Sequence, residues 1–198
     1  TTVKLADDNL VATLDTVADA NLTVDLTGAA GARALTVTDA ETVTFTNTSA
    51  GTDTSVANTV LDATDTTGLT VTGAATAGDT IATGNITGTN ALSSLTVTSQ
   101  ATGATATVGT VADADGLTSI TINANGANAS FGQIGTNATA NNAELLATLD
   151  VDASGTGVTA TTGAIFADNT VDSASDLAMT VTSDIGSGAT GTMGAITN

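Results

Sequence analysis

The chain has 198 residues and a formal net charge of −18, and it contains no Pro, Cys, His, Trp or Tyr. Nucleic acid is excluded as a partner, because phosphate binding needs Lys and Arg and the chain has only two of these residues. The absence of Cys excludes a disulfide framework. No run of eighteen apolar residues occurs, so we expect no membrane span, and with 41% apolar but only 2% aromatic residues the core must be built from aliphatic side chains.

The N-terminal third contains short segments in which apolar and hydroxyl side chains alternate. They lie at Leu22–Leu26, Leu35–Thr38 and Val43–Thr46. A period of two is typical of β-strands with one buried face. Their spacing does not match the rest of the chain. Residues 1–65 are therefore either irregular coils of the repeat that follows or a sandwich-like β unit.

From residue 66 onward an apolar-x-apolar strand with Thr or Asp at its centre recurs. Its copies are Leu69–Val71, Leu95–Val97, Ile120–Ile122, Leu149–Val151 and Met179–Val181. Thr favours the pleated strand because its β-branched side chain restricts χ1. Gly and Asn clusters separate the strands and supply turns.

A Gly-x-Ile/Val step follows each of these strands. The steps are Gly84–Ile86, Gly109–Val111, Gly132–Ile134, Gly163–Ile165 and Gly194–Ile196, with Gly-to-Gly spacings of 25, 23, 31 and 31 residues. Self-similarity at this period is typical of solenoids. We predict an all-β parallel β-helix or β-solenoid with coils of about 23–31 residues, five of them over residues 66–198. Each Gly is expected at a tight bend or a close backbone approach.

The turn after each Gly-x-Ile/Val step collects oxygen-bearing side chains. They are Asn90, then Asp113 and Asp115, then Asn137, Asn141, Asn142 and Glu144, then Asp168, Asn169, Asp172 and Asp176. Stacked coils would place adjacent turns about 4.8 Å apart, close enough for two coils to share one calcium ion. The alternative is that these residues are ordinary turn residues that bond backbone N–H groups.

Asp150 and Asp152 form a second candidate, since both point outward from one strand. Their expected neighbours are Thr121 and Asn123 on one side and Thr180 and Thr182 on the other. The sequence thus predicts Ca²⁺ as the bound ion. The candidate ligands are Asp113, Asp115, Glu144, Asp150, Asp152, Asp168, Asp172 and Asp176.

Catalysis lacks its usual groups. There is no His, Cys or Tyr, and the cations are Lys4 and Arg33 alone. Paired carboxylates could cleave a polysaccharide, but such clefts normally add aromatic platforms. We therefore expect no enzymatic activity. The Thr-x-Thr ladders suggest an ice-binding face, but Asn123 and the Asp150/Asp152 pair interrupt them.

The acidic, Thr/Ala/Gly/Asn-rich composition and the loose Leu-Thr-Val-Thr…Gly-x-Ile repetition resemble bacterial surface-layer (S-layer) proteins exported by type I secretion. The resemblance implies a right-handed β-solenoid whose identical copies form a calcium-stabilised lattice on the bacterial cell surface. Contact with cell-surface polysaccharide would need a further domain, and we expect the chain to be part of a longer protein. Adhesin and autotransporter-passenger stalks look similar, so a stalk remains the main alternative.

Overall fold

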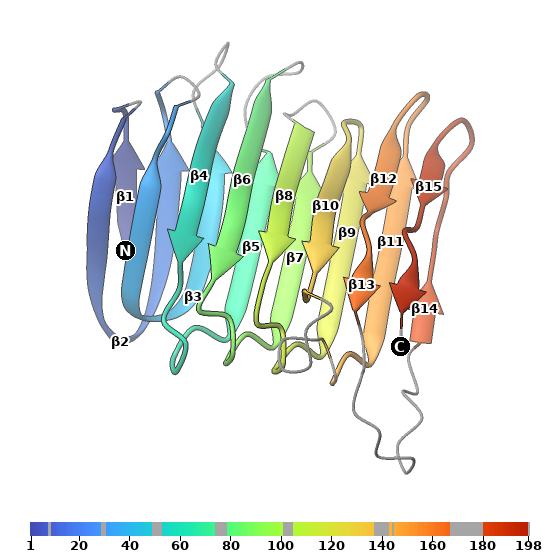
Figure 1. The fold of residues 1–198 in the computed structure, drawn as a ribbon. Helices are drawn as coiled ribbons and strands as arrows, with labels where there is room; N and C mark the ends of the chain where they lie inside the picture. Colours follow the sequence, from blue (N-terminus) through green and yellow to red (C-terminus); the bar gives the residue numbers. More distant parts are fainter. Residues whose placement is uncertain are drawn as a thin grey trace.

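The fold is all-β. The computed structural model describes residues 1–7, 9–28, 31–48, 53–73, 79–100, 105–136, 143, 145–166 and 180–197, and every element in them is a strand. Within these residues there is no helix of the length and apolarity that crossing a membrane would require. The strands form one parallel sheet that is folded into two facing walls (Figure 1).

The first wall faces the viewer in Figure 1, and the second lies behind it. Two long strands, β2 (Val11–Leu26) and β3 (Ala34–Asn47), cross from the first wall to the second. The other first-wall strands are β4 (Thr54–Val60), β6 (Thr80–Thr87), β8 (Thr105–Val111), β10 (Ala129–Ile134), β12 (Thr159–Thr162), β13 (Ile165–Phe166), β15 (Thr190–Thr192) and β16 (Ile196–Thr197). The other second-wall strands are β1 (Thr2–Leu5), β5 (Gly68–Gly73), β7 (Ser94–Ser99), β9 (Ser119–Asn125), β11 (Thr148–Ser154) and β14 (Thr180–Thr182).

One strand from each wall makes a coil, and successive coils pair in parallel. This arrangement confirms the predicted β-solenoid. The N-terminal strands belong to the same sheet, because β1 pairs with β2, β2 with β3, and β3 with both β4 and β5. Parallel pairing here favours further coils over a sandwich for residues 1–65. The register between β2 and β3 shifts after Asp15 and again at Ala20, so this part is irregular.

Apolar side chains of successive coils lie directly over one another and fill the space between the walls. In the second wall the register joins Leu69, Leu95, Ile120 and Leu149, and in the first wall it joins Ile86, Val111, Ile134 and Ile165. All eight are buried. Burying one such side chain contributes about 1.5–3 kcal/mol, so the aliphatic columns are the main stabilising feature of the stack.

The glycines of the Gly-x-Ile/Val steps form a column of their own. A Cβ on any of them would approach the backbone of the preceding coil, as a Cβ on Gly163 would overlap the carbonyl oxygen of Gly132. The column comprises Gly84, Gly109, Gly132, Gly163 and Gly194. The predicted close backbone approach is confirmed.

In the last coil the register differs from the sequence prediction by two residues. Thr182, not Thr180, lies beside Asp150, and Val181 lies beside Leu149. Met179 lies outside the described residues. Because strand side chains repeat with a period of two, a shift by two keeps every side chain on its predicted face. The alternation therefore fixed the face and left this register open.

Candidate metal centre

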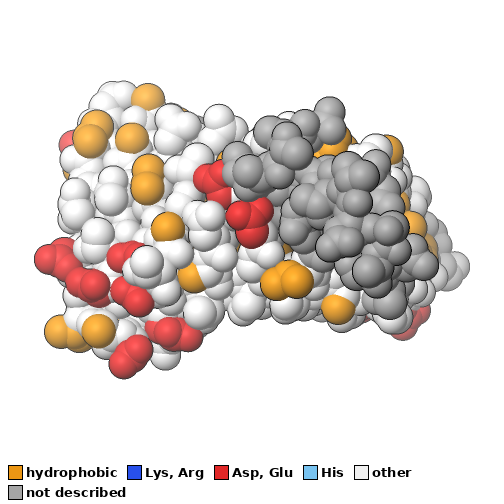
Figure 2. Space-filling model, turned by 60° about the horizontal axis from the view of Figure 1, so that its bottom comes forward, with side chains coloured by type: hydrophobic (Ala, Val, Ile, Leu, Met, Phe, Trp, Pro, Cys, Tyr) orange, Lys and Arg blue, Asp and Glu red, His pale blue; other side chains and the backbone are white. Residues whose placement is uncertain are grey.

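The turns that lead from the first wall to the second lie along one edge of the stack, the lower edge in Figure 1. In the described residues these turns span residues 61–67, 88–93 and 112–118, and the bend of β3 near Asp39 continues the row. We call this edge the turn edge. Figure 2 brings it forward and shows acidic side chains toward the N-terminal coils and again near the middle, with no Lys or Arg visible among them.

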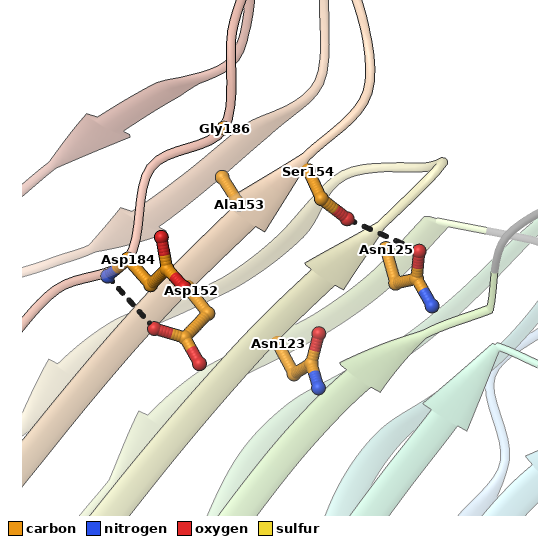
Figure 3. Close-up of a pocket in the computed structure, with 7 residues that line it drawn as sticks. All are labelled: Asn123, Asn125, Asp152, Ala153, Ser154, Asp184 and Gly186. Carbon is orange, nitrogen blue, oxygen red and sulfur yellow. Dashed lines mark hydrogen bonds between the residues drawn. The ribbon is translucent and has the colours of Figure 1, made fainter.

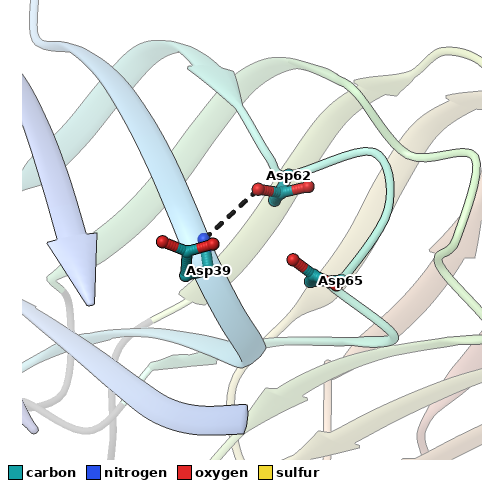
Figure 4. Close-up of side chains that lie close together, drawn as sticks. All are labelled: Asp39, Asp62 and Asp65. Atoms are coloured by element: carbon teal, nitrogen blue, oxygen red, sulfur yellow. Dashed lines mark hydrogen bonds between the residues drawn. The ribbon is translucent and has the colours of Figure 1, made fainter. Parts of the chain in front are cut away.

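Three aspartates converge at the N-terminal part of the turn edge. One carboxylate oxygen from each of Asp39, Asp62 and Asp65 lies within 4.8 Å of the others (Figure 4). Asp39 sits where β3 bends between the walls and has a φ of 59°, a left-handed conformation that Asp tolerates better than most residues. Asp62 and Asp65 come from the turn between β4 and β5, one coil further on. The cluster thus joins two coils.

Hydrogen bonds hold Asp62 in place. Its Oδ1 accepts from the backbone N–H of Thr64 at 2.9 Å and from the Thr64 hydroxyl at 2.7 Å, while its Oδ2 accepts from the backbone N–H of Asp39 at 3.2 Å. These three donors lower the pKa of Asp62 below its usual value of 3.8. The Thr64 N–H has the largest effect, and the Thr64 hydroxyl and the Asp39 N–H come next. The Asp62 carboxylate therefore stays ionised beside two other acidic groups.

The predicted ligands of the turn edge are placed only in part. Asp113 and Asp115 lie in the turn between β8 and β9, on the predicted edge, and Asp113 has a φ of 54°. The Asp113 carbonyl accepts a hydrogen bond from the Thr89 hydroxyl of the preceding coil at 3.0 Å. Among the described residues, these two are not part of a group of three carboxylates at ligand distance. Four predicted ligands lie outside the described residues: Glu144, Asp168, Asp172 and Asp176.

Asp150 and Asp152 lie on the outer face of the second wall. As predicted, Asp150 is beside Thr121 and Asp152 is beside Asn123. On the other side the Thr182 hydroxyl donates to Asp150, and the Asp184 N–H donates to Asp152 at 2.9 Å. Asp184, which the sequence prediction did not include, is therefore the next residue in the row.

A groove of about 320 Å³ lies beside this row (Figure 3). It is lined by Asn123, Asn125, Asp152, Ala153, Ser154, Asp184 and Gly186. The Ser154 hydroxyl bonds the amide oxygen of Asn125 at 3.1 Å, which fixes one side of the lining. Two carboxylates on neighbouring coils face this groove, and with the amide oxygens they offer hard oxygen ligands.

The sequence prediction does not include the Asp39, Asp62 and Asp65 cluster, because the strand spacing in residues 1–65 does not match that of the later coils. A usable signal was present. The register places Asn58 beside Asn85 and Thr59 beside Ile86, so Asp62 follows β4 at the position where Thr89, next to Asn90, follows β6. Aligning Ala57–Thr59 with the step Gly84–Ile86 would have predicted acidic residues in the next turn.

The geometry offers oxygen ligands at two places, the three-carboxylate cluster on the turn edge and the row on the second wall. Hard oxygen donors suit Ca²⁺ and Mg²⁺, whereas zinc and copper prefer the imidazole and thiolate ligands that this chain lacks. Comparison with known proteins found no matching family model, no matching curated protein and no matching solved structure.

Proposed function

We propose that this chain is a structural component of an extracellular bacterial surface layer, in which identical copies associate and calcium bridges acidic side chains. The observation that carries the proposal is the cluster of Asp39, Asp62 and Asp65, since it joins two coils of a regular stack. A stack of coils is suited to mechanical work and to presenting repeated contacts.

The charge of the chain supports a cation requirement. The chain has twenty acidic residues and only two basic ones, so its carboxylates repel one another in the folded state. Calcium takes six to eight oxygen ligands at about 2.3–2.6 Å, so three carboxylates would fill part of its coordination and leave positions for water, a backbone carbonyl or a second copy. The last of these would link calcium binding to assembly.

Assembly of the 198-residue chain with and without calcium tests the proposal. We expect ordered sheets or filaments by electron microscopy in calcium, and their loss in EDTA. Asp62→Asn combined with Asp65→Asn should abolish the calcium effect, because it removes two of the three charges from the cluster. A matched control is Asp53→Asn, an exposed acidic residue that bonds only the Thr80 hydroxyl among the contacts described.

Three results would contradict the proposal: the same particles with and without calcium, a cluster variant that assembles like the parent, or a control that fails as the cluster variant does. A chain that binds calcium but stays monomeric would instead favour the adhesin or passenger stalk. The extended stack of coils in Figure 1 suits a spacer as well.

A further inference from the structure

The outer face of the second wall carries rows of threonine that continue from coil to coil. In each of β3, β5 and β7 two Thr side chains point outward on either side of one buried residue. We call these six side chains the threonine array: Thr44 and Thr46, Thr70 and Thr72, and Thr96 and Thr98. The register joins them into two rows, and the first row continues to Thr23 in β2 and to Thr121 in β9.

The residues that interrupt the rows lie outside the array. Asn123 takes the next position of the second row in β9, and Asp150 follows Thr121 in the first row. Asp25, which precedes the second row, is buried. From Thr44 to Thr121 the first row recurs at intervals of 26, 26 and 25 residues, and the register does not shift between these strands. The array is therefore regular through the middle of the stack.

Two repeats describe the array. Neighbouring strands lie about 4.8 Å apart, and side chains two residues apart along a strand are separated by about 6.6 Å. Leu95 and Val97 lie buried beneath the face and support it, as do their neighbours in the adjacent coils. Because Thr is β-branched, its χ1 is already restricted in a strand, so the array loses little side-chain freedom when it binds a partner.

The hydroxyl groups of the array are available to a partner. Within the described part of the chain, the hydroxyls of Thr70, Thr96 and Thr98 make no hydrogen bond. By contrast, on the turn edge the Thr64 hydroxyl donates to a carboxylate and the Thr66 hydroxyl to a backbone carbonyl. The array thus presents regularly spaced hydroxyls that bond only solvent.

The chemistry of the array suits a flat, uncharged and periodic partner. Soluble small molecules bind in concave sites, and the described groove lies to one side of the array, at Asp152. Protein interfaces are enriched in aromatic residues and Arg, but the chain has no Trp or Tyr and its one Arg is buried. A repeat in two dimensions matches a solid surface with a repeat of its own.

We propose that the threonine array binds ice. Its repeats, about 4.8 Å across the strands and about 6.6 Å along them, are close to the repeats of oxygen atoms on a prism face of hexagonal ice. Water molecules bonded to the hydroxyl rows therefore occupy positions that the crystal continues. This activity goes beyond the proposed function and needs neither calcium nor the association of copies.

Partition of the chain between slowly growing ice and the remaining liquid tests the proposal. We expect the ice fraction to exceed that of serum albumin, a protein with no such array. Thr96→Tyr should lower the ice-to-liquid ratio by about tenfold, because a ring at the centre of the array holds the crystal away from several hydroxyls at once. The matched control is Thr107→Tyr, an outward position of β8 on the first wall, which should keep the parent ratio.

A variant that extends the array gives a result that misfolding cannot imitate. Asn123→Thr continues the second row into β9, so it should raise the ice-to-liquid ratio by about twofold or more. Asn123→Gln, which keeps the amide, should leave the ratio unchanged. Circular dichroism checks the fold of each variant, and the two Asn123 variants decide if Thr96→Tyr does not fold.

Several results would overturn ice binding: a parent chain that ice excludes as it excludes serum albumin, equal losses from folded Thr96→Tyr and Thr107→Tyr, or no gain from Asn123→Thr. Binding to insoluble chitin or cellulose without partition into ice would assign the face to a polysaccharide and overturn the proposal as well.

Ice binding and the proposed function fail separately. Asp62→Asn combined with Asp65→Asn should partition into ice as the parent does, although it loses the calcium effect on assembly. Calcium-dependent sheets from a chain that ice excludes would overturn ice binding alone. Partition into ice by a chain that ignores calcium would support the array and overturn the calcium bridge.

Discussion

At Gly163 the backbone of one coil approaches the next so closely that a methyl group has no room. The Cβ of an alanine would overlap the Gly132 carbonyl oxygen, and backbone cannot swing aside as a side chain can. We expect Gly163→Ala to lower the free energy of unfolding by about 3 kcal/mol or more. Gly68→Ala is the control, because its nearest neighbours are the side chains of Thr42 and Ser94 at 3.2 and 3.5 Å. Urea unfolding of both variants checks the prediction, and equal losses would contradict it.

Asp62 makes stability depend on pH at the acidic end. Its hydrogen bonds lower the pKa of Asp62 in the folded state below the usual 3.8, so the unfolded state takes up the proton first as pH falls. The stabilisation from Asp62 is complete above the usual pKa of 3.8, and it is lost as the pH falls from there through the lowered pKa of the folded state. In metal-free buffer with EDTA, Asp62→Asn should be less stable than the parent at about pH 6, and the gap should narrow toward about pH 3. A gap that widens as pH falls would contradict the sign of this shift.

The contribution of an isoleucine to the free energy of unfolding depends on where its strand lies in the stack. Ile122 of β9 lies between Val97 and Val151 and is buried, whereas Ile196 of β16 has a described neighbour on one side only and is 39% exposed. Ile122→Ala should cost about 2–5 kcal/mol because it leaves a cavity, and Ile196→Ala in the monomer should cost less than about 1 kcal/mol. Thermal unfolding at low protein concentration measures both. Similar losses would mean that the end coil packs as tightly as the centre.

The strands and their inward faces could be predicted from sequence because alternation with a period of two depends on single residues. Pairing partners could be predicted where the Gly-x-Ile/Val steps mark each coil. Two features escaped prediction. The two-residue shift in β14 leaves the alternation unchanged. The bend of β3 hid the coils that bring Asp39 to Asp62, because Ala34 pairs with Asn58 before the bend and Thr42 pairs with Gly68 after it, so the spacing to the next coil changes at the bend. A site built from two coils is visible in sequence only when the coils are already aligned.

For the whole molecule, the net charge of −18 works against the stack that the aliphatic columns favour. The residues involved differ in how far apart they lie. Asp152 and Asp184 follow one another in a row, and Asp39, Asp62 and Asp65 have ligand atoms within 4.8 Å, whereas the two groups lie on separate parts of the surface. Repulsion between distant groups and repulsion within a group should therefore respond to different ions.

Monovalent salt screens only the repulsion between distant acidic groups. At about 0.15 M the Debye length is about 8 Å, which is longer than the separation of the carboxylates within the Asp39, Asp62 and Asp65 cluster. We expect sodium chloride to raise the melting temperature modestly, and calcium chloride at equal ionic strength to raise it further by binding the folded state. Asp62→Asn combined with Asp65→Asn should keep the sodium effect and lose the extra calcium effect. Differential scanning calorimetry of both proteins separates the two. If sodium and calcium act equally on the parent chain, charge screening alone explains the salt response, and the cluster does not bind calcium.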